Sequence, residues 1–382
     1  MVAAIAGGAI LAPAAEMIGA RRNSVNLERL AHGISSFTVR FFAFAATWAV
    51  LALVLLVGLY PAMLSTLLQV FFWPLVAVVA TWLLMTASAY YYYYSWKRLG
   101  AGQGRHAAVG WAFALSAVAF IGLITLLSSF QLTPTQRAPL VAAILNPTWL
   151  TELTHRLVGN FSYVGFVIAG IAGVRMLWSP GDKDRAYFDW LGNFGLLLGV
   201  GVLLLQPIVG WFYASQIQAG SPDAYTRVMV GQYSWLFLVQ SFFLAVAFLL
   251  GNIYLTQTAN ARAKLGAGAR AWMRWATVAI ALLGVLLVIP QQFPLGTMSP
   301  WKYLGLAGFL VFGGTTLFLY LRAMPTFTWG NARAGSQWAL VAAAVVAILL
   351  FTTMGVIRTT ARGGEPIVGP LGGGANQQLV GQ

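Results

Sequence analysis

Ten apolar runs, each long enough to cross a lipid bilayer, constrain this chain more than any other feature. They cover about residues 3–20, 34–59, 71–95, 108–130, 150–177, 190–213, 233–256, 271–290, 303–322 and 338–357. A membrane-spanning helix needs roughly 20 mainly apolar residues, and lipid offers no partner for an unpaired backbone group. We therefore predict an all-α, polytopic membrane bundle of about ten transmembrane helices. It forms a single bundle over residues 1–357, followed by an extracytoplasmic tail over 358–382.

The composition agrees with a lipid-solvated protein. Hydrophobic residues make up 59% of the chain and charged residues only 8%, whereas a soluble domain averages about 25% charged residues. The net charge of +14 lies mostly in short loops between apolar runs, which is how membrane topology is encoded and not how a phosphate-binding face is built. We expect lipid and not nucleic acid as a partner. The lack of cysteine excludes disulfides, thiolate metal sites and covalently attached c-type haem.

The basic residues also predict the orientation. Most of the 22 Lys and Arg residues follow the odd-numbered runs, so the positive-inside rule places those loops in the cytoplasm and both termini outside. The first run lacks a basic leader with a cleavage site, so we expect a retained helix and not a signal peptide. The chain is predicted to be a multi-pass protein of a bacterial or archaeal cytoplasmic membrane.

Acidic residues are scarce, and all of them fall at the ends of apolar runs or in loops. They are Glu16, Glu28, Glu152, Asp182, Asp184, Asp189, Asp223 and Glu365. Proton pumps and ion-coupled transporters place carboxylates at membrane depth, so this distribution disfavours a transporter. The tyrosine run Tyr90–Tyr94 precedes Lys97 and Arg98, and we interpret it as an interfacial aromatic belt and not as a radical relay.

One stretch, "NPTWLTELTHRLVGNFSYVGF" (146–166), holds His155, one of three histidines. His155 and Gly159 share a helix face. This arrangement suits a haem ligand, because the imidazole can reach iron and the missing side chain lets the macrocycle approach the helix. Arg156 is then a partner for a haem propionate. The alternative is an interfacial histidine capped by Glu152, with the glycine serving helix packing. The residues of this stretch leave both interpretations open.

The stretch resembles the helix of cytochrome bd oxidase subunit I that bears the histidine ligand of its outer, low-spin b-type haem. Three other segments resemble that family in the same order along the chain: "EMIGARRNSVNLERLAHGISSFTVRFFAF", "YYYYYSWKRLG" and "LLQPIVGWFYASQ". Together the matches cover most of residues 10–235. The resemblance implies a cytochrome bd subunit I-like fold, with one haem b near the outer face and His155 as its axial ligand.

Departures from the family pattern limit what the resemblance implies. The further haem-ligating histidine of the family's first helix, upstream of the position of Glu16, has no counterpart. The third-helix glutamates of the family's oxygen-reducing centre have no counterpart either. The lysine and glutamate of the family's quinol loop align with Tyr225 and Val230, so both are replaced. We therefore expect that the outer haem site is kept and the oxygen-reducing centre is lost.

The family's low-spin haem has a methionine as its second axial ligand. Met354 is our first candidate, because Arg358 and Arg362 follow it and would hold the propionates. Met229 and Met298 are the alternatives. The other two histidines, His32 and His106, are predicted on the inner side, with His106 in a loop.

Quinone contacts, if the chain makes them, are predicted at Gln206, Trp211, Tyr213 and Arg227, which offer aromatic walls and hydrogen-bond donors. The function implied is that of a haem b subunit of a respiratory complex, passing electrons between the quinone pool and an extracytoplasmic cytochrome or other redox protein. Such a chain would not act as an enzyme without other subunits. Two alternatives stay open: a haem-free membrane anchor, and a bd-type oxygen reductase subunit whose missing ligands come from a partner chain.

Overall fold

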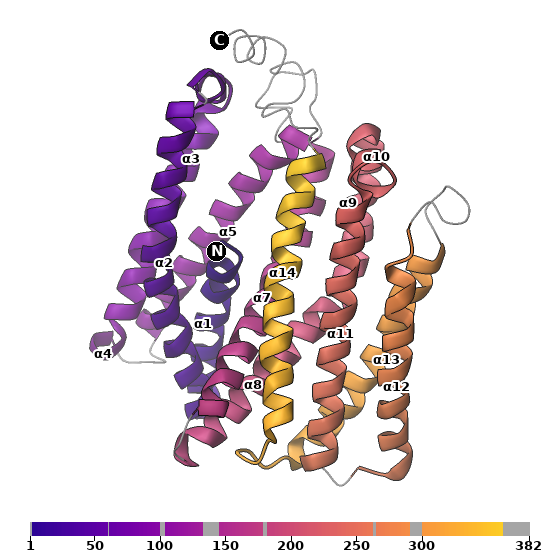
Figure 1. Ribbon diagram of the computed structural model, residues 1–382. Helices are drawn as coiled ribbons and strands as arrows, with labels where there is room; N and C mark the ends of the chain where they lie inside the picture. Colours follow the sequence, from indigo (N-terminus) through magenta and orange to yellow (C-terminus); the bar gives the residue numbers. More distant parts are fainter. Residues whose placement is uncertain are drawn as a thin grey trace. The chain divides into compact units, whose positions relative to one another are not determined.

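The computed structural model describes residues 2–59, 61–99, 104–132, 145–178, 182–262, 265–290 and 300–361, and every regular element in these ranges is helical. The elements are α1 (Val2–Arg22), α2 (Val25–Leu59), α3 (Pro61–Tyr94), α4 (Trp96–Leu99), α5 (Gly104–Leu132), α7 (Pro147–Trp178), α8 (Asp182–Leu203), α9 (Gln206–Gly220), α10 (Pro222–Met229), α11 (Ser234–Arg262), α12 (Ala267–Leu287), α13 (Pro300–Ala323), the 3-10 turn η1 (Met324–Thr326) and α14 (Ala334–Ala361) (Figure 1). In this part of the chain, ten spans are long and apolar enough to cross a membrane. The predicted polytopic helical fold is confirmed.

Most helices extend beyond the apolar runs because polar residues continue or cap them. α2 begins at Val25, nine residues before its apolar run, and the turn before it places Asn23 in the left-handed region (φ 49). Asparagine tolerates that conformation better than most residues, which suits the residue that ends a helix. The amide of Ser24 then donates to the carbonyl of Gly19 (2.9 Å) and closes α1.

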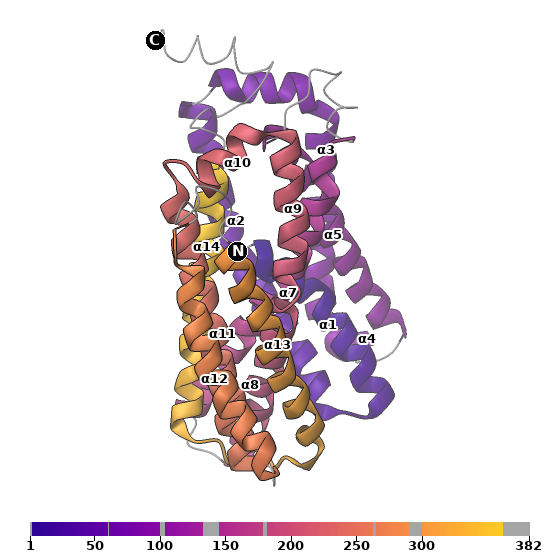
Figure 2. The same ribbon diagram turned by 90° about the vertical axis from the view of Figure 1, so that its right-hand side faces the viewer.

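Two helices are interrupted near prolines. In α3 the backbone at Phe71 is not helical (φ −116, ψ 27), and Pro74 follows within one turn. The stretch before this kink lies across the direction of the rest of α3 (Figure 2). The sixth predicted span consists of α8 and α9, which are separated at Leu204 and Leu205 just before Pro207. A proline lacks the amide proton that would continue the helical ladder.

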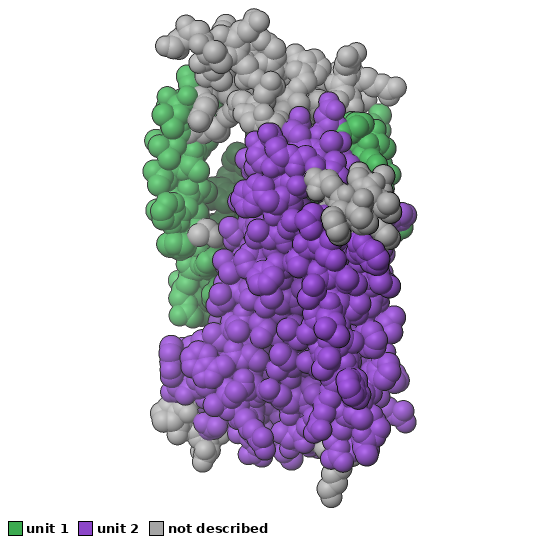
Figure 3. All heavy atoms as spheres, turned by 45° about the vertical axis from the view of Figure 1, so that its right-hand side comes forward, with its two compact units in different colours: residues 1–160, 212–222, 364–382 green, residues 161–211, 223–363 purple. Residues whose placement is uncertain are grey.

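The chain divides into two compact units (Figure 3). Unit 1 comprises residues 1–160 and 212–222, with 364–382 outside the described residues, and unit 2 comprises residues 161–211 and 223–363. α7 and α9 each contribute residues to both. The single bundle over 1–357 stays a prediction. Of the predicted tail 358–382, only the first residues to Ala361 are described.

The core of unit 1 forms where α1, α2, α3 and α5 pack. Its buried residues include Ile5, Phe42, Met85 and Phe113. Small residues allow the close approach: a Cβ at Gly110 would come within 2.8 Å of Pro13. Small residues are the usual contacts between membrane helices, because lipid supplies no hydrophobic drive for their association.

Unit 2 is built around α8, α11, α12, α13 and α14, together with the second half of α7. Phe248 and Phe309 lie at its centre with their ring centroids 4.9 Å apart. α7 and α8 meet through glycines, and the hydroxyl of Ser162 donates to the carbonyl of Gly199 (2.9 Å) across this contact. The second half of α7 is thus fixed by backbone-to-backbone packing.

Candidate functional site

The first turn of α7 is fixed by its cap and by α5. Asn146 stands at the N-cap position, where its side-chain oxygen accepts hydrogen bonds from the Thr148 amide (3.0 Å) and hydroxyl (2.6 Å). Pro147 occupies the first helical position, where its missing amide proton costs nothing. The indole of Trp149 donates to the carbonyl of Gly122 on α5 (3.0 Å). These contacts position the helix that carries His155.

One turn further along α7, Glu152 is buried at 1% exposure. Its carboxylate accepts a hydrogen bond from the Ser129 hydroxyl (2.9 Å) and lies 3.0 Å from the Arg156 Nε atom. Arg156 also donates to the hydroxyl of Thr125 (3.2 Å). A buried carboxylate needs such partners to offset its desolvation. The Arg156 side chain remains 29% exposed.

His155 is half-buried and lies against an aromatic ring from α9. The ring centroids of His155 and Tyr213 lie 5.6 Å apart at an interplanar angle of 32°. Gly159, one turn later, is buried. Unit 1 therefore brings His155 of α7 and Tyr213 of α9 together.

Other predicted residues lie in unit 2. Arg227 on α10 donates from Nε (3.2 Å) and Nη2 (2.8 Å) to the carbonyl of Ala361, the last residue of α14. The same end of α14 carries Met354 and Arg358, which are four residues apart and share one face. A cation at a helix C-terminus satisfies free carbonyls and opposes the helix dipole.

The remaining candidates are spread over α9 and α10 or are not described. Gln206 begins α9, Trp211 lies on α9 with 52% exposure, and Met229 ends α10. Arg362 and Met298 lie outside the described residues.

Sequence reasoning missed two buried ionisable pairs. In unit 1 the His106 Nδ1 atom lies 2.7 Å from the Glu16 carboxylate, and in unit 2 the Arg262 guanidinium pairs with Asp189. The prediction that His106 lies in a loop is wrong. α5 begins at Gly104, and His106 is fully buried in its first turn. The two partners of each pair are distant in sequence, so no local motif indicates either pair.

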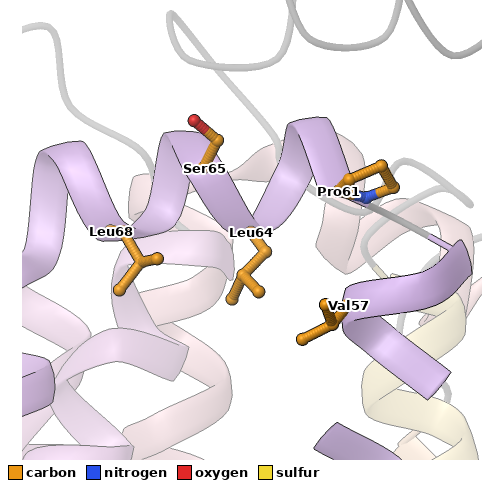
Figure 4. A pocket seen from close by; sticks show the side chains of 5 residues that line it. All are labelled: Val57, Pro61, Leu64, Ser65 and Leu68. Atoms are coloured by element: carbon orange, nitrogen blue, oxygen red, sulfur yellow. The ribbon is translucent and has the colours of Figure 1, made fainter. Parts of the chain in front are cut away.

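One surface hollow in unit 1 contains none of the predicted site residues. It has a volume of about 410 Å³ and lies between the end of α2 and the start of α3, lined by Val57, Pro61, Leu64, Ser65 and Leu68 (Figure 4). Its lining is almost wholly apolar, as expected for a surface that faces lipid.

No protein-family model and no curated protein matches the chain. Among solved structures, it is similar to the bd oxidase from Geobacillus thermodenitrificans, with a TM-score of 0.54 and 15% sequence identity. The match covers 95% of this chain and 94% of that chain. At this identity the likeness concerns the fold, and it supports a bd oxidase-like helical architecture over nearly the whole chain.

Proposed function

We propose that this chain is a haem b-binding membrane subunit of a respiratory electron-transfer complex, derived from the cytochrome bd subunit I family. It passes electrons between the quinone pool and a redox partner on the outer side. The observation that carries the proposal is the arrangement at His155: a half-buried imidazole in contact with the Tyr213 ring, with a glycine one turn later. This is the histidine that the resemblance assigns to the outer haem, and the fold likeness supports the same family.

In this proposal, His155 would bind the iron through its imidazole, Gly159 would let the macrocycle approach the helix, and Arg156 would donate to a propionate. Glu152 neutralises the rest of that guanidinium, so the protein adds little net positive charge beside the iron. A bound haem supplies reversible one-electron chemistry. The protein residues hold it, orient the imidazole and limit its contact with water.

Met354 would supply the second ligand of the iron in this proposal, with Met229 as the alternative, and Arg358 and Arg362 would hold propionates. The hydrogen bonds from Arg227 to Ala361 keep the last turns of α14 in place, and that helix end bears both Met354 and Arg358. Methionine and histidine together are a common ligand pair for low-spin electron carriers.

Quinone contacts are assigned in this proposal to Gln206, Trp211, Tyr213 and Arg227. A single haem near one face cannot carry charge across the bilayer, so the chain needs further subunits, including an extracytoplasmic cytochrome or other redox protein. Tyr213 already touches His155, and a quinone bound against it would lie within short electron-transfer distance of the haem ligand.

A haem-free anchor subunit is the second candidate, and one observation favours it. Arg156, the residue assigned to a propionate, is already paired with Glu152 within the protein. In a former haem site that no longer binds haem, such an arginine is expected to take an internal partner.

Haem content separates the two candidates. The purified protein is assayed for haem b per chain as the pyridine haemochrome, with His155→Ala beside His32→Ala, a histidine exposed on α2. We expect about one haem per chain in the wild type and in His32→Ala, and loss of it in His155→Ala. Absence of haem from the wild type, or its retention in His155→Ala, would reject the proposed function.

A further inference from the structure

The exposed face of α12 in unit 2 has no part in the proposed function. The first two turns of this helix carry Arg270 and Arg274, and both side chains are exposed. Within the described residues, neither guanidinium takes part in an ion pair or a side-chain hydrogen bond. Both cations therefore lack a counter-charge in this part of the chain.

An apolar stripe continues from these arginines along the same helix. Trp275, Val278, Leu282 and Val285 are 48–71% exposed, and their spacing of three and four residues places them on one face. Arg274 stands four residues before Val278, so it lies at the head of this stripe. The opposite face of α12 packs into the core of unit 2, and the stripe itself is left for a partner within the membrane.

The neighbouring helix adds a third cation and no acid. α12 and α13 lie side by side (Figures 1 and 2), and they run antiparallel, because Gly305 near the start of α13 packs on Leu287 at the end of α12. Arg322 is exposed in the last turn of α13 and thus lies at the same end of the helix pair as the start of α12. No acidic residue occurs between Asp223 and Glu365, so α11, α12 and α13 carry no carboxylate that could neutralise these arginines.

The length of the stripe matches one leaflet of a bilayer. Val285 stands eleven residues after Arg274, which is about 16 Å along a helix axis. The hydrocarbon core of a bilayer is about 30 Å thick, so one leaflet of acyl chains extends over about 15 Å. A lipid with its headgroup at the arginines therefore has an acyl chain long enough to cover the whole stripe.

We propose that Arg270, Arg274 and the stripe from Trp275 to Val285 form a binding site for an anionic phospholipid. The arginines bind the headgroup phosphate, the indole of Trp275 lies at headgroup level, and an acyl chain packs along the stripe. The distribution of basic residues predicts that this end of α12 faces the cytoplasm, so the lipid belongs to the inner leaflet. The site does not depend on the haem of the proposed function.

The charge of the headgroup determines the selectivity of this site. Each arginine near the membrane surface is expected to strengthen the binding of an anionic lipid roughly fivefold. A zwitterionic lipid gains less, because its own cationic group opposes the arginines. Two arginines should therefore give roughly a 25-fold preference for phosphatidylglycerol over phosphatidylcholine.

The test is the quenching of tryptophan fluorescence by brominated lipids in reconstituted vesicles. The probes are phosphatidylglycerol and phosphatidylcholine, each brominated on its acyl chains and mixed into unbrominated phosphatidylcholine. The signal of Trp275 is the difference between a protein and the same protein with Trp275→Phe. We expect brominated phosphatidylglycerol to quench this signal at a ratio of brominated to unbrominated lipid roughly 25-fold lower than brominated phosphatidylcholine requires.

Two pairs of substitutions test the arginines. Arg270→Gln with Arg274→Gln should abolish most of the preference, whereas Arg270→Lys with Arg274→Lys should keep most of it, because lysine binds phosphate as a point charge. The control is Trp48 on α2, which is 53% exposed in a stretch without charged residues between Arg40 and Lys97. Its signal, obtained with Trp48→Phe, should show no preference between the two lipids.

Three results would overturn the proposal. One is equal quenching of Trp275 by the two lipids in the wild type, and another is a preference that the glutamine pair leaves unchanged. The third is a Trp275 signal that neither lipid quenches, since a protein partner or a second copy of this chain would then cover the stripe.

Discussion

The contact between α7 and α8 in unit 2 gives a quantitative test of the packing. An added Cβ at Gly165 would lie 2.7 Å from the Gly195 oxygen and closer still to the Gly199 nitrogen, although Cβ atoms in proteins do not approach such atoms nearer than 3.0 Å. The obstacle is backbone, so it cannot rotate away as a side chain would. Gly165→Ala therefore has to push the two helices apart.

The expected cost is about 2 kcal/mol of unfolding free energy. Overpacking costs roughly 1–3 kcal/mol, and a rigid obstacle places this site in the upper part of that range. The higher helix propensity of alanine offsets up to about 1 kcal/mol of this cost. For a chain of 382 residues, an unfolding entropy of roughly 2.1 cal/mol/K per residue converts this cost into a fall of the melting temperature by about 2–3 °C.

The control is Gly314→Ala on α13, where an added Cβ meets nothing within 4 Å. That variant should melt at the same temperature as the wild type or slightly higher, because only the helix propensity changes. Both are measured by tryptophan fluorescence during heating in detergent. If Gly165→Ala melts as high as the wild type, the close approach of α7 and α8 is refuted.

Three further substitutions test other contacts by the same thermal assay. Asp189→Ala leaves the buried Arg262 without its counter-charge and should cost roughly 3–5 kcal/mol, while adding Arg262→Leu should restore most of the loss; no recovery would contradict a direct pair. Arg227→Leu removes the donors to Ala361 and should cost about 1.5–3 kcal/mol, with faster amide exchange in the last turn of α14; unchanged exchange would exclude the cap. Trp149→Phe should cost about 1 kcal/mol through one lost hydrogen bond, and full stability would show that the bond contributes nothing.

The membrane fold can be predicted from the sequence because helix length and hydropathy are local properties. Ten apolar runs predict the ten spans, and a proline anticipates the break before α9. Helix ends are less predictable, since caps such as Asn146 and Thr148 add polar turns outside the apolar run. That cap could have been recognised in "NPT", where an asparagine precedes a proline at the first helical position.

The buried polar pairs cannot be predicted from the sequence in the same way. Glu16 and His106 are 90 positions apart, and Asp189 and Arg262 are 73 positions apart. Each residue alone looks like a charged group at the end of a span, and only the packing of the helices brings the partners together. The tyrosine run shows the same limit: Tyr91 and Tyr94 are exposed as an aromatic belt would be, but Tyr92 is fully buried on Glu16.

The contact between His155 and Tyr213 was also beyond sequence reasoning, because the two residues were assigned separately, one to the haem and the other to a quinone. The ring contact in unit 1 brings them together. The roles of Met354, Arg358 and Arg362 stay predictions.

A reduced-minus-oxidised visible spectrum of the purified wild-type protein tests the central claim most directly. A haem b bound by His155 and a methionine should give a sharp low-spin α-band on reduction, and this band should disappear in His155→Ala and shift to a high-spin form in Met354→Ala. A flat wild-type spectrum would contradict the account and leave a haem-free anchor as the function of this chain.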